Sequence, residues 1–418
     1  MKSVVYLIAL LYCFVWFRIP DIAGVNLPVL RLIGWLGLII FILNFCLRKK
    51  IYKGPLGDRF ILFSIIFFAN MIINFLWHSS SGSFSPLFFI MDFSKYLAAF
   101  SVAYLVYYAL SKNVVNENKF IKFLMYSGIA SIFLTFLSLG LYLVGFRSTN
   151  DILLKTFGNS WGVWPTASLL PRLAGTASEP QQLSIVFLTP LLLIIAYKSG
   201  KFGLIYILGI AALFLSQSKF ALLSIMIVFL FTLIISSSRR KLIFTFLGLC
   251  ALPFLVNFIM NQPVFAQAAE QGLDARAFQE RFENAEILSN VIKESPILGI
   301  GAGQYGIYRS QVLPVEYNPG YYPNNDYLKI FGELGIIGFI IVMWFFYKLF
   351  KASYFSYKFI PKKERAIFLA NLIGTITIML NMMIGYEFLH VFFWINVGLL
   401  MYHCEKYYKL NPSLKSTP

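Results

Sequence analysis

Charged residues are scarce in this chain, and their scarcity argues against a soluble fold. Only 13% of the 418 residues are Asp, Glu, Lys or Arg, whereas soluble domains carry about 25%. Hydrophobic residues make up 59% of the chain and gather in runs long enough to cross a bilayer. The composition therefore predicts an integral membrane protein.

The chain also lacks the patterns of several kinds of site. No Asp-x-Asp occurs, which argues against a metal-dependent sugar-nucleotide transferase. The glycines of residues 299–303 follow no predicted strand, which argues against a dinucleotide-binding loop. Neither a repeat period nor inverted broken helices are present, which weakens a transporter hypothesis. We expect no metal and no other cofactor. The four cysteines have neither metal-ligand nor disulfide spacing: Cys13, Cys46, Cys250 and Cys404.

About twelve apolar runs are long enough to span a bilayer, at residues 3–19, 27–47, 60–77, 87–110, 120–146, 181–197, 202–216, 219–236, 242–260, 333–351, 366–384 and 386–402. About two thirds of the 35 Lys and Arg residues lie in alternate connections, as in cytoplasmic loops. This predicts that both termini are cytoplasmic and that the first run is an uncleaved signal anchor. The net charge of +17 then reflects topology, and we expect no nucleic-acid partner.

Two long connections, residues 147–180 and 261–332, fall on the outer side in this orientation. They hold most of the acidic residues of the chain, and loops of this length in a compact protein are usually functional. The predicted fold is an all-α polytopic membrane protein, a single transmembrane domain over residues 1–418 with two large outer loops.

The first outer loop ends with Arg172 and with Ser178-Glu179-Pro180. Ser178 can cap the next helix, proline suits its first position, and an acid favours its positive end. Glu179 either serves that helix or accepts a hydroxyl proton at the membrane surface. Arg172 is either an interface arginine with its stem in the membrane or a ligand for an anion.

The second outer loop opens with an amphipathic helix over about residues 274–294. Its apolar face holds Phe278, Phe282, Leu288 and Ile292, and Arg281 falls on that face. A cation there needs an anionic partner, either a carboxylate such as Glu179 or a phosphate of the substrate.

Other polar groups have more ordinary predicted roles. Asp92 and Lys95 are spaced to pair within the fourth span, and Glu387 and His390 suit the membrane interface. Tyrosines of the second loop offer ring faces and hydroxyls to sugars, although tyrosine is also common at membrane interfaces; they are Tyr305, Tyr308, Tyr317, Tyr321, Tyr322 and Tyr327.

Four passages resemble the bacterial O-antigen polymerase and O-antigen ligase superfamily of membrane glycosyltransferases. They are Arg172–Gly175 with Ser178–Pro180, the turn Leu215–Lys219, Arg281 followed by Pro296–Gly301, and Asn324–Asn325 followed by Gly335–Gly338. The ligase motif has histidine where this chain has Asn324, and asparagine cannot exchange a proton near neutral pH. The resemblance therefore favours a polymerase over a ligase.

This resemblance implies a metal-independent enzyme of the inner membrane with its active site on the periplasmic face. It would transfer a growing surface glycan from undecaprenyl pyrophosphate onto the non-reducing end of a lipid-linked repeat. Arg172 and Arg281 would bind pyrophosphate, and Glu179 would activate the acceptor. Membrane lipids and a chain-length regulator are expected partners; a ligase or a flippase is the alternative. Expected substrate-binding residues are Arg147, Arg309, Tyr322, Asn324, Asn325 and Tyr327.

Overall fold

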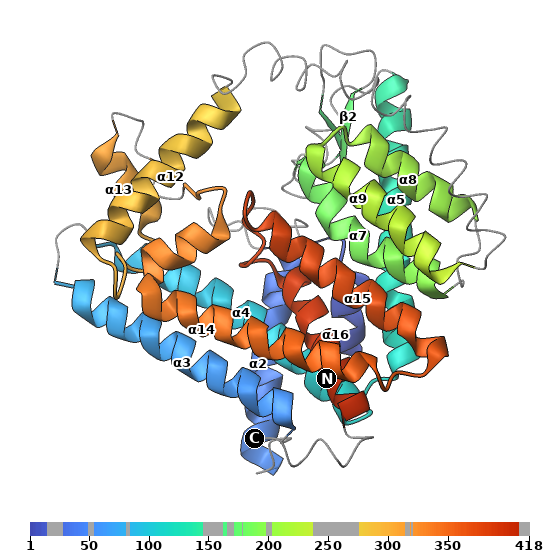
Figure 1. Ribbon diagram of the computed structural model, residues 1–418, viewed down its shortest axis with the longest axis horizontal. Helices are drawn as coiled ribbons and strands as arrows, with labels where there is room; N and C mark the ends of the chain where they lie inside the picture. The colour runs from blue at the N-terminus through green and yellow to red at the C-terminus, as the bar shows by residue number, and fades with distance from the viewer. Residues whose placement is uncertain are drawn as a thin grey trace. The chain divides into compact units, whose positions relative to one another are not determined.

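The computed structural model describes residues 1–14, 28–48, 54–80, 84–144, 162–164, 171–177, 179–197, 203–236, 276–313, 318 and 321–408. These residues form thirteen helices and two short strands (Figure 1). They group into two compact units, which are interleaved along the chain. The first holds Met1–Ile33, Asn113–Gly272 and Pro361–Thr377, and the second holds Gly34–Lys112, Leu273–Ile360 and Ile378–Pro418.

The first unit is built around α5 (Glu117–Leu143) and α7 (Pro180–Tyr197), with α8 (Leu204–Leu215) and α9 (Lys219–Ile235) packed beside them (Figure 1). The helix α1 (Lys2–Leu10) packs on α5. Two short antiparallel strands, β1 (Gly162–Trp164) and β2 (Arg172–Gly175), also pack against α5. These strands are a departure from the all-helical prediction, and they lie in the connection that was expected to be a loop.

The second unit contains α3 (Pro55–His78), α4 (Pro86–Ser111), α14 (Asp326–Tyr357) and α16 (Val391–Tyr408). Close packing joins α4 to α16 and α3 to α14. Aromatic rings fill the space between these helices: the ring of Phe63 stacks 4.6 Å from that of Phe345, and Phe100 lies 4.4 Å from Trp394. Two further helices, α12 (Arg276–Glu294) and α13 (Tyr305–Val312), pack against α14.

Two helices have residues in both units. They are α2 (Val29–Arg48) and α15 (Lys362–Asn381).

Most of the predicted spans coincide with helices, within a few residues. The run at 242–260 lies outside the described residues, and α14 begins at Asp326, inside the stretch that was expected to be loop.

Local sequence explains where several helices begin. Proline occupies the first turn of α3 and α4, where its missing N–H is not needed. Side chains of Asn116, Ser218 and Asn325 accept a backbone N–H at the starts of α5, α9 and α14, which satisfies donors that have no partner inside the helix.

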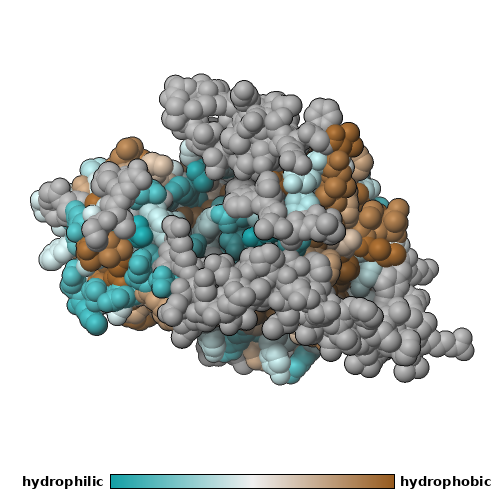
Figure 2. Space-filling view, turned by 90° about the horizontal axis from the view of Figure 1, so that it is seen from above, coloured by the Kyte–Doolittle hydropathy of each residue, from teal (hydrophilic) through white to brown (hydrophobic). Residues whose placement is uncertain are grey.

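Five of the described helices are long and apolar enough to cross a membrane: α3, α4, α5, α7 and α14. Large apolar side chains of α5 and α8 are exposed, among them Phe133, Leu143 and Leu204, and the right side of Figure 2 is brown there. Exposed apolar surface of this extent indicates contact with lipid. Hydrophilic side chains gather instead over α12 and α13, at the left of Figure 2.

Candidate functional site

In the first unit, Arg172 and Glu179 lie at a corner between β2 and α7. The Arg172 side chain is half-buried, and its Nε donates to the carbonyl oxygen of Ser216 over 3.5 Å. Burial lowers the pKa of Arg172, and the carboxylate of Glu179 acts in the opposite direction. A guanidinium still remains charged at neutral pH. The two residues that were predicted to share a site are therefore close enough to influence one another.

Glu179 also marks the beginning of α7. Its carbonyl oxygen accepts from the N–H groups of Gln182 and Leu183, and its Oε2 accepts from the Gln181 side chain at 2.6 Å. Pro180 is the first residue of the helix, as predicted, whereas Ser178 lies outside the described residues. The backbone of Glu179 therefore begins the helix, while one oxygen of its carboxylate is bonded to Gln181.

The serine turn between α8 and α9 completes this corner. Gln217 has a positive φ of 48°, and the Ser218 hydroxyl accepts from the N–H of Ala221 at 3.0 Å. Ser184 of α7 lies 3.2 Å from the hydroxyls of both Ser216 and Ser218. Two of the four passages that carry the family resemblance, the one with Arg172 and the one with Ser216, thus meet at one place.

In the second unit, a loop of residues 296–304 (the glycine loop) is bonded to a break in α14. The break occurs at Gly335, which has φ 68° and ψ −174°. The freed carbonyl oxygens of Gly332 and Glu333 accept from the loop N–H groups of Ile300 and Gly301, each at 3.0 Å. In return, the N–H of Ile336 donates to the carbonyl oxygen of Pro296 at 2.9 Å. The other two passages of the resemblance therefore meet here.

Glycine is required on both sides of this junction. Gly299, Gly301 and Gly303 all have positive φ, between 73° and 108°, a conformation that side chains disfavour. A Cβ at Gly335 would collide with the backbone of Ile297. Asn70 and Asn74 of α3 add side-chain bonds to the freed carbonyls of Leu334 and Glu333.

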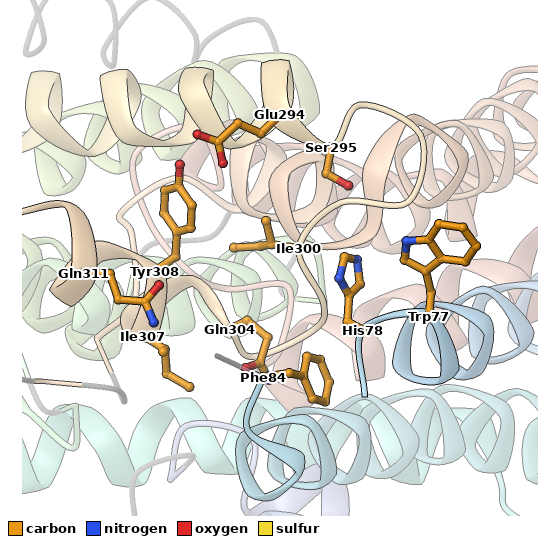
Figure 3. Close-up of a pocket in the computed structure, with 10 residues that line it drawn as sticks. All are labelled: Trp77, His78, Phe84, Glu294, Ser295, Ile300, Gln304, Ile307, Tyr308 and Gln311. Atoms are coloured by element: carbon orange, nitrogen blue, oxygen red, sulfur yellow. The ribbon is translucent and has the colours of Figure 1, made fainter. Parts of the chain in front are cut away.

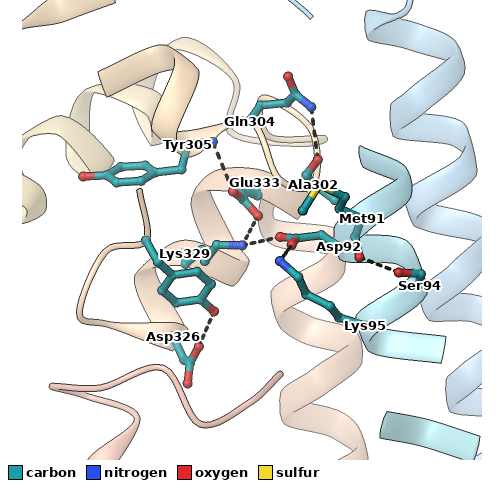
Figure 4. Close-up of polar contacts among 11 residues, drawn as sticks. Met91, Asp92, Ser94, Lys95, Ala302, Gln304, Tyr305, Asp326, Lys329 and Glu333 are labelled. Carbon is teal, nitrogen blue, oxygen red and sulfur yellow. Dashed lines mark hydrogen bonds and ion pairs between the residues drawn. The ribbon is translucent and has the colours of Figure 1, made fainter. Parts of the chain in front are cut away.

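Beneath this junction lies a buried network of charges (Figure 4). The Lys329 Nζ is 2.9 Å from Oδ2 of Asp92 and 2.6 Å from Oε2 of Glu333. The predicted pair of Asp92 with Lys95 is present at 2.5 Å. The N–H of Tyr305 donates to the other oxygen of Glu333 at 3.1 Å. Two cations therefore balance two carboxylates, and each buried charge has a partner.

Sequence reasoning assigned no role to Lys329 or Glu333. Their i, i+4 spacing favours a salt bridge within one helix. That spacing could be used only if both residues were placed in the same helix, which begins at Asp326. The two residues were divided between a loop that ended at residue 332 and a span that began at residue 333.

The predicted sugar-binding residues of the second loop lie in this unit. The Tyr322 hydroxyl donates to Asp326 at 2.6 Å, and Tyr327 donates to the carbonyl of Met379 at 2.9 Å. The buried Asp326 also accepts from the N–H of Phe388 at 2.8 Å. Burial, and then the Asp326 charge, raises the pKa of Tyr322 well above its usual value. Tyr322 therefore stays protonated.

Three further residues of the candidate set have positions on or near α13 and α14. The Arg309 guanidinium lies over the Tyr321 ring, 4.1 Å from its centre. Asn325 caps α14, with its side chain accepting from Leu328 N at 3.0 Å, and the half-buried Asn324 precedes it. Arg147 lies outside the described residues.

The buried face of α12 differs from the predicted one. Phe282 is 57% exposed, while Asn284, Ile287, Leu288 and Val291 are buried. Asn284 is on this face because its amide oxygen accepts from Tyr305 OH at 2.8 Å and its amide nitrogen donates to Tyr321 OH at 2.9 Å. Of the predicted face, Leu288 is buried as expected and Phe282 is not, while the side chain of Phe278 lies outside the described residues. Arg281 belongs to α12, and its side chain lies outside the described part of the chain.

Among the described residues, no group of three or more His, Cys, Asp or Glu side chains is placed to hold a metal ion.

Comparison with known families gives one match. The family model described as O-antigen ligase matches residues 204–343, a segment that contains the serine turn, α12, the glycine loop and the break in α14. No curated protein matches the chain. Together with the long apolar helices, this match indicates a multi-pass membrane protein and supports membership in the O-antigen polymerase and ligase superfamily.

Proposed function

We propose that this protein is a surface-polysaccharide polymerase of the inner membrane. Its substrates are oligosaccharide repeats on undecaprenyl pyrophosphate, at the periplasmic face. The observation that carries the proposal is the corner of Arg172, Glu179 and Ser216, where a charged guanidinium is half-buried beside a carboxylate. The described contact of Arg172 is one long hydrogen bond to a neutral carbonyl, and a charged, planar guanidinium suits an anionic ligand.

In this reaction the acceptor hydroxyl oxygen bonds to the anomeric carbon of the growing glycan. The bond from that carbon to the pyrophosphate oxygen breaks, and pyrophosphate leaves with the electron pair. Glu179 takes the hydroxyl proton. Arg172, together with Arg281 of α12, stabilises the charge that develops on the leaving group. Arg147 and Arg309 are further cations for the lipid-linked substrate, and a chain-length regulator is a proposed partner.

A ligase is the second candidate, because the matching family model is described as O-antigen ligase. A ligase would transfer finished glycan to a different acceptor, lipid A–core. The chain carries Asn324 directly before the cap of α14, at the position where the ligase motif has histidine. An amide cannot take a proton near neutral pH, and this difference favours the polymerase.

The test is deletion of the gene in the source bacterium, followed by gel analysis of the surface polysaccharide. A polymerase predicts that a long ladder collapses to core carrying a single repeat. Loss of all attached repeats, with lipid-linked polymer accumulating, would identify a ligase. An unchanged ladder would contradict both enzymes.

A further inference from the structure

A cavity of about 420 Å³ opens beside the glycine loop in the second unit. Its walls come from the end of α3, the end of α12, the loop itself and α13 (Figure 3). Small-ligand pockets usually measure about 300–1,000 Å³, so the cavity has room for a small ligand. The described residues that line it do not include those assigned above to pyrophosphate or to acceptor activation.

One side of the cavity is aromatic. Trp77 lies at the end of α3 with 70% of its surface exposed. The ring of His78 stacks on that of Phe84, with centres 6.4 Å apart and an angle of 11° between the planes. Aromatic faces of this kind pack against the C–H face of a sugar ring.

The opposite side is polar and carries one negative charge. Figure 3 shows Glu294, Tyr308 and Gln311 along this side. Burial, and then a hydrogen bond to Glu294, raises the pKa of Tyr308 to about 12, so its hydroxyl remains a donor at neutral pH. A carboxylate with two acceptor oxygens can bind two neighbouring hydroxyls of one sugar.

The charge of the described lining residues disfavours pyrophosphate as a ligand of this cavity. None of the described residues that line the cavity is a lysine or an arginine, and Glu294 would repel an anion. Neutral groups rich in hydroxyls match this lining instead.

The cavity is held open by bonds within its frame. The amide of Gln304 accepts from the N–H of Ser85 at 2.9 Å and donates to its carbonyl at 3.0 Å. His78 Nε2 donates to the carbonyl of Gly299 at 2.8 Å. These bonds connect α3 and the start of α4 to the glycine loop, and a site that is formed in advance loses less entropy when it binds.

We propose that this cavity is a saccharide subsite that binds an uncharged pyranose unit of the lipid-linked glycan, with Trp77 and Phe84 against the ring and Glu294 on its hydroxyls. The assignment of the sugar to a lipid-linked glycan rests on the proposed function. The subsite would hold the sugar portion of a lipid-linked substrate.

The test uses the full-length protein in lipid nanodiscs. The probe is the oligosaccharide repeat released from its lipid and free of phosphate, and saturation-transfer NMR measures its binding. Trp77→Ala and Glu294→Gln should each weaken binding about ten-fold, from the loss of stacking or of a charge-assisted hydrogen bond.

Leu76→Ala is the matched control for Trp77, because Leu76 is its neighbour, is 66% exposed and does not line the cavity. It should bind as the unaltered protein does, and so should Arg172→Gln. Binding that is unchanged in both Trp77→Ala and Glu294→Gln, or absent from the unaltered protein, would overturn the subsite. Chain growth is assayed on the same nanodiscs. If the protein binds the probe normally but does not lengthen the glycan, the result counts against the polymerase and supports the subsite.

Discussion

Two buried cations of this protein differ in how completely the chain neutralises them. Lys329 in the second unit is 2% exposed and bridges two carboxylates. Arg172 in the first unit is half-buried, and its described hydrogen bond is a 3.5 Å contact to a carbonyl oxygen. The lysine is satisfied within the fold, which explains it as a structural charge. Arg172 is instead proposed to bind an anionic ligand, so burial of a charge alone does not mark a binding site.

The largest effect is expected from Lys329→Met. The substitution leaves Asp92 and Glu333 buried without their shared cation, at a cost of about 3–5 kcal/mol in the free energy of unfolding. Thermal unfolding of the purified protein should show a large loss of stability. The control is Lys95→Met: the Lys95 side chain is 22% exposed and Asp92 keeps Lys329, so the loss should be much smaller. Equal losses would mean that the network is not centred on Lys329.

A second prediction concerns Arg172→Gln, which should leave thermal stability almost unchanged and reduce chain growth. Losing a charge-assisted contact to pyrophosphate costs about 1.5–3 kcal/mol in binding, roughly ten- to hundred-fold in affinity. Assay of chain growth with lipid-linked repeats measures the effect. Arg172→Lys keeps the charge and loses the planar fork, and intermediate activity is expected. Normal chain growth by the glutamine variant would make Arg172 structural, like Lys329.

The third and smallest expected effect is that of Gly335→Ala. A positive φ of 68° and the collision with the Ile297 backbone should destabilise the protein by about 1–3 kcal/mol. Thermal unfolding measures the loss. Gly140→Ala is the control, since a Cβ at Gly140 of α5 meets nothing within 4 Å; alanine there should stabilise the helix slightly. A neutral Gly335→Ala would show that the glycine loop does not depend on the break in α14.

Much of the helical framework was predictable from hydropathy and caps. Apolar runs located α3, α4, α5, α7 and α9 within a few residues, because long apolar segments have few alternatives in a bilayer. The pair of Asp92 with Lys95 followed from helical spacing. Proximity of Arg172 to Glu179 followed from their closeness in sequence.

The connections were predicted less well, since their structure depends on contacts between distant segments. Hydropathy favoured a span that began at residue 333, whereas α14 begins at Asp326 and breaks at Gly335, and the turns before the break carry the buried pair of Lys329 and Glu333. Apolar periodicity placed Phe282 inside, whereas hydrogen bonds of Asn284 to two tyrosines turn α12 to another face. Each error came from buried polar partners, which hydropathy does not record.

The most direct measurement is chain growth by the purified protein with one kind of substrate. Lipid-linked repeats are supplied as both donor and acceptor, in nanodiscs, and the lipid-linked products are separated by length. The proposed polymerase activity predicts undecaprenyl pyrophosphate carrying two or more repeats, with no other acceptor present. Transfer only when lipid A–core is added, with no lengthening on the carrier, would contradict it and identify a ligase.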